Sequence, residues 1–357
     1  MASLRPLMIA LVLSLLSSAG WSLSLTEDQQ KKLQAARQEM GLKEGEPFKR
    51  HICLWDISGT SGPVFNGATD LRLDLLRYDI DISLEAFTNE GVMVASLKNG
   101  HCDAALMSGF RARQFNRFTG TIDAIGGLPN LDHMKTLLRT LAHPNLDKYM
   151  VSNKYQTLAV APAGAAYLFV DDKRMNSLAQ AAGKKVAVLD FDPGQSKLVT
   201  HIGAAAVSTN LATAPNLFNN GTVNILPAPL IAYEVLELYK GMEPDGGIVN
   251  YPIVQLTAQL IAHTDKFPPA IASLIRDVAA DSFTSIQTAL QKEADKIPEH
   301  WWIEVSSQNQ MEYDDMMRAA RLKLRETGYY DGTMLSIMKR IRCSEDPQRP
   351  ECSQESE

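Results

Sequence analysis

The residues best suited to bind a ligand follow short apolar runs that have the pattern of buried strands. In open α/β sheets, ligands bind in the crevice outside the carboxyl ends of the strands. Arg111 and Arg113 in such positions would hold an anion. Asp56, Asp190 and Asp192 would instead hold an amine or another cation. The candidate ligand-binding residues at these strand ends are Trp55, Asp56, Ser58, Ser108, Arg111, Arg113, Asp190, Phe191, Asp192, Pro227, Tyr233 and Asn250.

Both sets of charges also have a structural interpretation. The two arginines could belong to a surface loop held by salt bridges. The two aspartates around Pro193 and Gly194 could be turn and helix-cap residues. The residue pattern alone therefore leaves the charge of the ligand open.

Signatures of enzymes and of bound cofactors are missing from the sequence. The run from Gly59 to Gly62 is not a nucleophile elbow, and there is no zinc-protease motif, phosphate loop or dinucleotide fingerprint. His51, His101 and His133 stand isolated in the sequence and are interpreted as structural or surface residues. We expect a protein that is not an enzyme, with no metal and no cofactor.

The composition places these residues in a chain of about two domains. The 357 residues carry 35 Lys+Arg and 41 Asp+Glu, so the net charge is 35 − 41 = −6. At about 150 residues per domain, the length suggests two domains. The acidic balance argues against nucleic acid as a partner.

The N-terminus has the pattern of a secretory signal peptide. Arg5 precedes an apolar run from Leu7 to Leu16, which is too short to span a bilayer and is followed by small residues. We expect residues 1–24 to be cleaved and the mature protein to be periplasmic. The mature chain then loses Arg5 and has a net charge of 34 − 41 = −7.

Export also bears on the four cysteines. In an oxidising compartment an even number of cysteines favours disulfides. We expect a local pair between Cys343 and Cys352, and a second pair between Cys53 and Cys102 on neighbouring strands. The alternative is that the thiols are free and buried.

Apolar periodicity predicts an α/β protein whose strands alternate with helices. A capping box at Thr26 opens a first helix. We expect strands at 52–57, 80–87, 104–107, 166–170, 185–189, 223–226 and 246–250, and helices at 65–78, 91–98, 177–182, 195–202 and 230–239. From residue 253 onward we expect the chain to be helical to its end, with one helix starting at Pro268-Pro269.

Two segments echo each other before buried strands. Residues 96–103 and 217–224 each carry an Asn-Gly pair, in which the glycine would take the left-handed conformation that ends a helix. This similarity is either the common sequence of a turn between a helix and a strand or a sign of two similar lobes. We expect a two-lobed periplasmic binding protein fold with parallel-rich sheets: lobe I at 25–162, lobe II at 163–252, and C-terminal helices at 253–357 packing across both.

Several motifs resemble a known family. They are Leu97-Lys-Asn-Gly-His-Cys-Asp-Ala104, Gly109-Phe-Arg-Ala-Arg-Gln-Phe-Asn-Arg-Phe-Thr-Gly120, Ile125-Gly-Gly-Leu-Pro-Asn130, Gly164-Ala-Ala-Tyr-Leu-Phe-Val170, Ala182-Gly-Lys-Lys-Val-Ala-Val-Leu-Asp190 and Leu238-Tyr-Lys-Gly241. They resemble the periplasmic solute-binding subunits of TRAP-type transporters, the DctP-like group, and more closely its AdeT-like branch. The resemblance implies a two-lobed protein that captures a small-molecule solute and delivers it to membrane transporter subunits.

The sequence departs from the TRAP pattern at two positions. Typical TRAP proteins carry an arginine on the strand after Gly-Lys-Lys-Val and another on the strand that opens the second lobe. Here Ala187 and Tyr167 occupy those stretches, so Tyr167 joins the candidate ligand-binding residues. Neither side chain can replace a guanidinium that clamps a carboxylate. A second hypothesis is therefore an adaptor of a transport or efflux complex that binds no small molecule.

Overall fold

The computed structural model describes residues 24–354, and its contacts divide the chain into two compact units. Of the described residues, unit 1 comprises 24–116 together with Ala142–Ala161 and Ala258–Ser282. Unit 2 comprises Arg117–Leu141, Pro162–Thr257 and 283–354. The chain therefore passes between the units five times, after residues 116, 141, 161, 257 and 282. The predicted signal peptide lies almost wholly outside the described residues.

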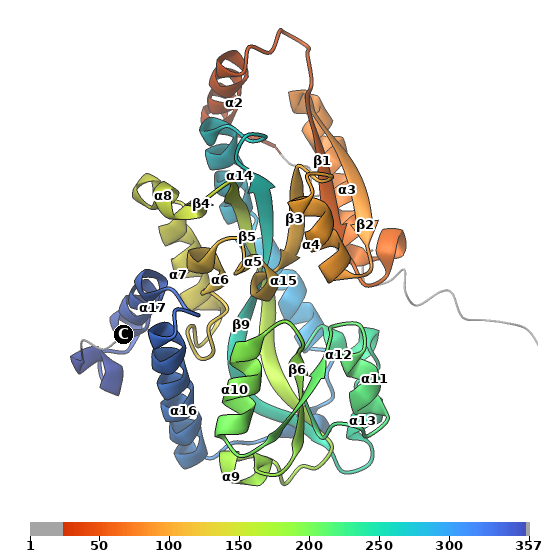
Figure 1. Cartoon of the computed structure of the whole chain (residues 1–357), viewed down its shortest axis with the longest axis vertical. Helices are drawn as coiled ribbons and strands as arrows, with labels where there is room; N and C mark the ends of the chain where they lie inside the picture. Colours follow the sequence, from red (N-terminus) through yellow and green to blue (C-terminus); the bar gives the residue numbers. More distant parts are fainter. Residues whose placement is uncertain (1–23, 355–357) are drawn as a thin grey trace, which may run out of the picture. The chain divides into compact units, whose positions relative to one another are not determined.

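Unit 1 is a sheet flanked by helices (Figure 1). Its strands are β1 (Phe48–Trp55), β2 (Ile80–Phe87), β3 (Ala104–Ser108), β4 (Val151–Ser152), the start of β5 (Tyr155–Val170) and the end of β9 (Gly247–His263). Its helices are α2 (Glu27–Glu39), η1 (Gly59–Ser61), α3 (Pro63–Leu75), η2 (Leu76–Tyr78), α4 (Glu90–Lys98), α5 (Gly109–Ala112), η3 (Pro144–Leu146), α8 (Asp147–Met150) and α14 (Pro269–Asp281).

The sheet of unit 1 has the order β2-β1-β3-β9. β1 pairs in parallel with β2 and β3, whereas β3 pairs antiparallel with β9. Helices α3 and α4 pack on these strands, and α2 packs on α14. The capping box predicted at Thr26 is confirmed, because its Oγ1 accepts a bond from Gln29 N and Gln29 Oε1 accepts one from Thr26 N. The strand predicted at 80–87 is confirmed residue for residue.

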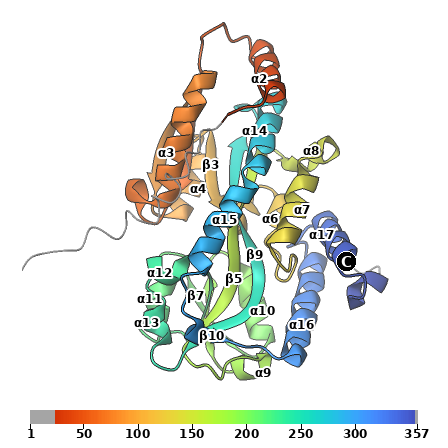
Figure 2. The same cartoon turned by 180° about the vertical axis from the view of Figure 1, so that it is seen from behind.

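Unit 2 repeats the alternation of strands and helices (Figure 2). Its strands are the end of β5, β6 (Lys185–Leu189), β7 (Ala205–Thr209), β8 (Ile225–Pro229), the start of β9 and β10 (Trp302–Ile303). Its helices are α6 (Arg117–Gly120), α7 (Leu131–Leu141), α9 (Leu178–Ala181), α10 (Pro193–His201), α11 (Ala214–Asn219), α12 (Ala232–Val235), α13 (Tyr239–Met242), α15 (Phe283–Ala294), η4 (Glu299–Trp301), α16 (Ser307–Glu326), α17 (Gly332–Glu345) and η5 (Pro350–Ser353).

The sheet of unit 2 has the order β5-β8-β6-β7, and β10 pairs with β9. β6 pairs in parallel with β7 and β8, and β5 pairs antiparallel with β8. Helix α10 packs on β6 and β7, and α11 packs on β6 and β8. The parallel-rich α/β architecture predicted from the sequence is confirmed in both units.

The expectation that the chain is helical from residue 253 is wrong. β9 continues without a break to His263. The strand buries Gln255, Thr257 and Gln259 to 3, 2 and 0% exposure. Leu256, Ala258 and Leu260 between them are only partly buried, so the polar residues occupy the more buried face. The helices after Pro268 are confirmed, with a break at Ser282 between α14 and α15.

The echo predicted between 96–103 and 217–224 is a shared structural corner. Gly100 and Gly221 have φ of +76° and +74°, so each glycine ends its helix in the left-handed region. Asp103 N then donates to His51 O and Asp103 Oδ2 accepts from His51 N. Asn224 N and Oδ1 bond Lys185 O and N in the same way. Each unit therefore ties its first parallel strand to a helix–strand corner through one polar side chain.

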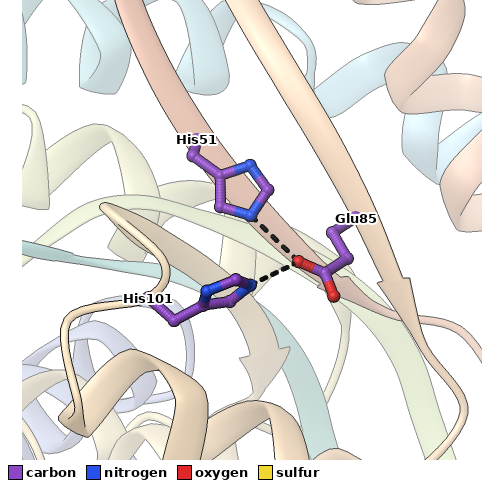
Figure 3. A group of neighbouring side chains, drawn as sticks. All are labelled: His51, Glu85 and His101. Carbon is purple, nitrogen blue, oxygen red and sulfur yellow. Dashed lines mark hydrogen bonds and ion pairs between the residues drawn. The ribbon is translucent and has the colours of Figure 1, made fainter.

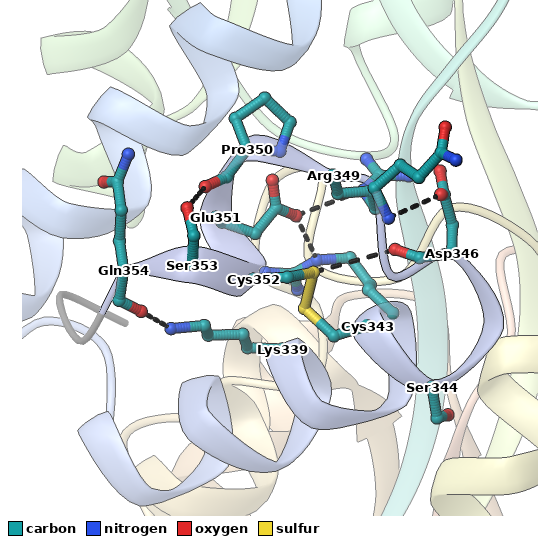
Figure 4. Close-up of a disulfide and its surroundings, with 12 residues drawn as sticks. Lys339, Cys343, Ser344, Asp346, Arg349, Pro350, Glu351, Cys352, Ser353 and Gln354 are labelled. Atoms are coloured by element: carbon teal, nitrogen blue, oxygen red, sulfur yellow. Dashed lines mark hydrogen bonds and ion pairs between the residues drawn. A yellow bond between two sulfur atoms is a disulfide. The ribbon is translucent and has the colours of Figure 1, made fainter.

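Both predicted disulfides are present. Cys53 bonds Cys102 in unit 1, and Cys343 bonds Cys352 in unit 2 (Figure 4).

Within residues 24–354, no helix has the length and apolar character needed to cross a membrane.

Candidate functional site

The predicted ligand residues of unit 1 lie at the carboxyl ends of its parallel strands. Trp55 is the last residue of β1, and Ser108 is the last residue of β3. Ser58 is exposed in the turn after β1. Arg111 and Arg113 lie in and directly after α5, which begins where β3 ends. The sequence thus placed these side chains correctly on neighbouring strand ends of one sheet.

Asp56 has a structural role at this edge. Its carboxylate is 3% exposed and accepts bonds from the backbone N–H groups of Ser58 (3.0 Å), Val64 (2.8 Å) and Phe65 (3.1 Å). The last two are among the orphan donors at the N-terminus of α3. A Cβ on Gly62 would lie 1.8 Å from Asp56 Oδ1, so only glycine allows this approach. Asp56 therefore caps the helix with Oδ2, and its Oδ1 holds the turn at Ser58.

Arg111 lies beside a buried acid that the sequence analysis missed. Glu90, the first residue of α4, is 6% exposed, and its Oε2 lies 3.7 Å from Arg111 Nε. Glu90 Oε1 accepts a bond from Ser108 N, and Ser108 Oγ accepts one from Arg111 N. Burial raises the pKa of Glu90 above its usual value, although the bond from Ser108 and the charge of Arg111 oppose this shift. The three residues form one polar cluster that links β3 to the start of α4.

The remaining arginine is also embedded in the unit. Arg113 is 9% exposed, and its guanidinium carbon lies 5.8 Å from the centre of the Phe110 ring. Arg111, in contrast, keeps 19% of its side chain exposed. Of the two predicted anion-binding arginines, Arg111 is thus the one more accessible to a solute.

In unit 2 the acidic pair after β6 divides into two roles. Asp190 is exposed and directly follows β6. Asp192 is 4% exposed and accepts bonds from Gly194 N (2.9 Å), Gln195 N (3.1 Å) and the Tyr329 hydroxyl. It is the N-cap of α10, as the structural interpretation of the sequence proposed. Phe191 lies half-buried between them.

The other predicted residues of unit 2 lie within strands or the core. Tyr167 is in β5 with its ring centre 5.7 Å from that of Trp302, and burial raises its pKa. Pro227 lies inside β8, not after it. Tyr233 is 7% exposed within the apolar core. Asn250 lies within β9 and donates to Glu304 Oε1 at 3.1 Å.

The interpretation of His51 and His101 as isolated residues is wrong. Their ring centres lie 5.2 Å apart, and both rings contact Glu85 in unit 1. Each histidine is within two residues of a cysteine of the predicted Cys53–Cys102 pair, and this proximity was the signal that could have revealed the contact. His133 lies elsewhere, in unit 2, with its Nε2 3.2 Å from Glu345.

Two curated proteins are similar to most of this chain. Probable solute-binding protein AdeT1 of Acinetobacter baumannii is 38% identical over 300 residues, which cover 84% of this chain and 99% of that protein. Probable solute-binding protein AdeT2 of the same organism is 30% identical over 234 residues, covering 65% and 98%.

Solved structures show the same fold at low sequence identity. A TRAP periplasmic solute binding protein from Desulfovibrio salexigens with bound orotic acid matches with a TM-score of 0.66 and 13% identity, covering 83% of this chain and 97% of that one. Another, from Bradyrhizobium sp. in complex with galacturonate, matches with a TM-score of 0.65 and 16% identity, covering 82% and 99%. The fold is therefore that of the two-lobed TRAP solute-binding proteins.

The family model described as solute-binding protein AdeT 1/2 matches residues 70–357. That match includes the α5 segment, the whole of β5 to β9 and the C-terminal helices. With the curated relatives and the fold in agreement, the chain belongs to the AdeT 1/2 family of solute-binding proteins.

Proposed function

We propose that this protein is a periplasmic solute-binding protein that captures a small molecule between two lobes and delivers it to membrane transport subunits. The observation that carries the proposal is the family match over residues 70–357. The apolar run at the N-terminus supports export through a cleaved signal peptide. Proteins with two lobes of this kind close around ligands by hinge motion.

The solute contacts that we propose lie at the strand ends of each unit. In unit 1 they are Trp55, Ser58 and Arg111, which follow or end parallel strands and keep part of their side chains accessible. In unit 2 they are Asp190 and Phe191, directly after β6. The carboxyl ends of parallel strands are where α/β proteins bind ligands.

We further infer that the solute carries an anionic group. Two of the three aspartates that would have favoured a cation, Asp56 and Asp192, already accept several backbone N–H bonds. Ala187 and Tyr167 supply no guanidinium, so the anionic group would be recognised from unit 1, through Arg111. This mode differs from the arginine clamp on the second lobe that the TRAP resemblance implies.

Native mass spectrometry of the protein taken from its own periplasm would identify what it carries, and a thermal-shift screen with carboxylates and amines would test the inference. A ligand at a hundredfold excess over Kd stabilises the folded state by about 2.7 kcal/mol, which such a screen detects. We expect a carboxylate to raise the Tm, and Arg111→Gln to remove most of that shift. Arg139→Gln, on the exposed side of α7, is the matched control and should leave it unchanged.

Stabilisation by an amine that survives Arg111→Gln would contradict the anionic solute. If no small molecule co-purified and none changed the Tm, the proposed capture function would itself be wrong.

A further inference from the structure

Three side chains that could ligate a metal ion meet on the sheet of unit 1 (Figure 3). Glu85 Oε2 lies 3.0 Å from His51 Nε2 and 2.8 Å from His101 Nε2. One possible ligand atom from each residue lies within 4.8 Å of the others.

Three separate elements bring these residues together. His51 is on β1, Glu85 is on the neighbouring strand β2, and His101 is in the turn between α4 and β3. Glu85 pairs with Cys53 in the parallel ladder, two residues beyond His51 on the same face of β1. The Cys53–Cys102 disulfide then fixes His101, the neighbour of Cys102, against that face. The pairing of β1 with β2 thus positions His51 and Glu85, and the disulfide positions His101.

The second unit offers an internal comparison, because it has the same corner. By the shared register, Lys185 corresponds to His51, Val207 to Glu85 and Thr222 to His101. Ala187 and Val223 likewise correspond to the disulfide cysteines. The corner therefore forms without histidines, acid or disulfide, so its backbone does not require the group found in unit 1.

We propose that His51, Glu85 and His101 bind a Zn²⁺ ion through the two Nε2 atoms and the carboxylate. Two imidazoles and one carboxylate form a ligand set typical of zinc, with a fourth position left to water. Zinc–ligand bonds of about 2.0–2.2 Å place tetrahedral ligand atoms about 3.3–3.5 Å apart. Glu85 Oε2 therefore needs to move only slightly away from the two Nε2 atoms. Their side chains are 29, 41 and 59% exposed, which gives an ion access.

The surroundings of His51 suit this role. Its Nδ1 lies 2.9 Å from Ser83 Oγ. When Nε2 binds a metal, Nδ1 carries the proton and can donate it to that hydroxyl, which orients the ring as outer-shell partners of metal-bound histidines do. The imidazole nitrogens favour Zn²⁺ or Cu²⁺ over Mg²⁺ and Ca²⁺, which prefer ligand sets made only of oxygen. The proposal rests on unit 1 alone and does not depend on the proposed solute.

Isothermal titration of the untagged, oxidised protein with Zn²⁺, followed by metal analysis after gel filtration, tests this site. We expect one Zn²⁺ per chain, with no comparable binding of Mg²⁺ or Ca²⁺. His101→Gln and Glu85→Gln should each weaken binding by at least about tenfold, because even changes in outer-shell partners cost about 10–100-fold. His201→Gln, at the exposed end of α10 in unit 2, is the matched control and should bind as the wild type does.

Unchanged Zn²⁺ affinity in both His101→Gln and Glu85→Gln would overturn the proposal, as would an equal loss in His201→Gln or the absence of saturable binding. Circular dichroism melts of each variant separate loss of the metal ligand from loss of the fold. His101 is the most exposed of the three, so its substitution is the least disruptive.

Discussion

Asp56 and Asp192, two of the predicted ligand-binding residues, have structural roles instead. Asp56 and Asp192 both follow a strand and precede a helix that begins with proline. Each is nearly inaccessible and accepts backbone N–H bonds at the helix N-terminus. At this position a carboxylate also interacts favourably with the helix dipole. Asp190, two residues before Asp192, is exposed and has no such role.

Removing the Asp56 carboxylate should therefore destabilise unit 1. Asp56→Ala leaves three backbone donors without their acceptor, and loss of a helix cap costs about 0.5–2 kcal/mol. We expect a loss of about 1–3 kcal/mol in the free energy of unfolding, measured by urea denaturation. Asp190→Ala is the control and should change it by less than about 0.5 kcal/mol. An equal effect of the two substitutions would contradict the capping role.

At this scale the sequence predicted positions better than partners. The cap role of Asp192 could be inferred from its position directly before Pro193, because the residues that cap a helix are its neighbours in the chain. Glu90 and Glu85 were missed, since their partners lie 21 and 16 residues further along at Arg111 and His101. Only the folded sheet brings such residues together.

At the scale of elements, the C-terminal segment is fastened by a buried ion pair and a disulfide. Arg342 on α17 is 0% exposed, donates to Glu351 Oε1 at 3.0 Å and to Gly127 O at 2.7 Å. Arg349 donates to the same carboxylate oxygen at 3.1 Å (Figure 4). Burial alone would raise the pKa of Glu351, but the bond from Arg342 and the two positive charges lower it.

Glu351→Gln should destabilise the protein by about 3–5 kcal/mol at pH 7, because it leaves the buried Arg342 without its counter-charge. Since folding lowers the pKa of Glu351, its stabilising effect is present above the unfolded-state value near 4.5 and is lost as the pH falls through the folded-state value. The difference between wild type and variant should therefore shrink in acid, as urea denaturation at several pH values would show. Glu326→Gln, at an exposed pair on α16, should have little effect. A difference independent of pH would contradict this account.

The two disulfides should differ in what their removal costs. They close chain segments with separations of 49 and 9 residues. By loop-closure entropy, replacing Cys53 and Cys102 with serine should cost about 4 kcal/mol, and replacing Cys343 and Cys352 about 2.7 kcal/mol. The first double substitution should also weaken the proposed Zn²⁺ binding, and the second should not. Titration with Zn²⁺ at a temperature where both variants are folded checks this, and equal affinities would contradict it.

Strands of apolar or alternating sequence are predicted more reliably than a strand that buries polar residues. The strands at 80–87 and 185–189 have the predicted bounds. The prediction of helix after residue 253 fails in β9, where Gln255, Thr257 and Gln259 are buried polar residues. Thr257 illustrates why, since its N and Oγ1 both donate to the buried Asp123 carboxylate, a partner 134 residues away.

At the scale of the whole molecule, neither unit is a continuous piece of chain. β3 of unit 1 pairs with Ala258–Ala262 of β9, which follow most of unit 2 in the sequence. A fragment ending at Asn116 would leave β3 as an unpaired edge and remove α14 from α2.

We therefore expect residues 25–116 expressed alone to be unfolded or aggregated, as judged by circular dichroism and gel filtration. The chain from residue 25 to its end is the control and should fold. A soluble, cooperatively melting fragment would contradict the dependence on β9. The sequence did predict a parallel-rich α/β protein and its repeated corner. It could not predict the five passages between units, because these depend on which strands pair across long separations.

The Cys53–Cys102 bond links the proposed zinc site to the redox state of the compartment that holds the protein. If the chain is exported as we propose, these thiols are free beforehand in a reducing cytoplasm, and the turn that carries His101 is held to the strand that carries His51 only by non-covalent contacts such as those of Asp103. Oxidation after translocation would then fix the ligand set that we propose. The molecule would reach its full zinc affinity only after export.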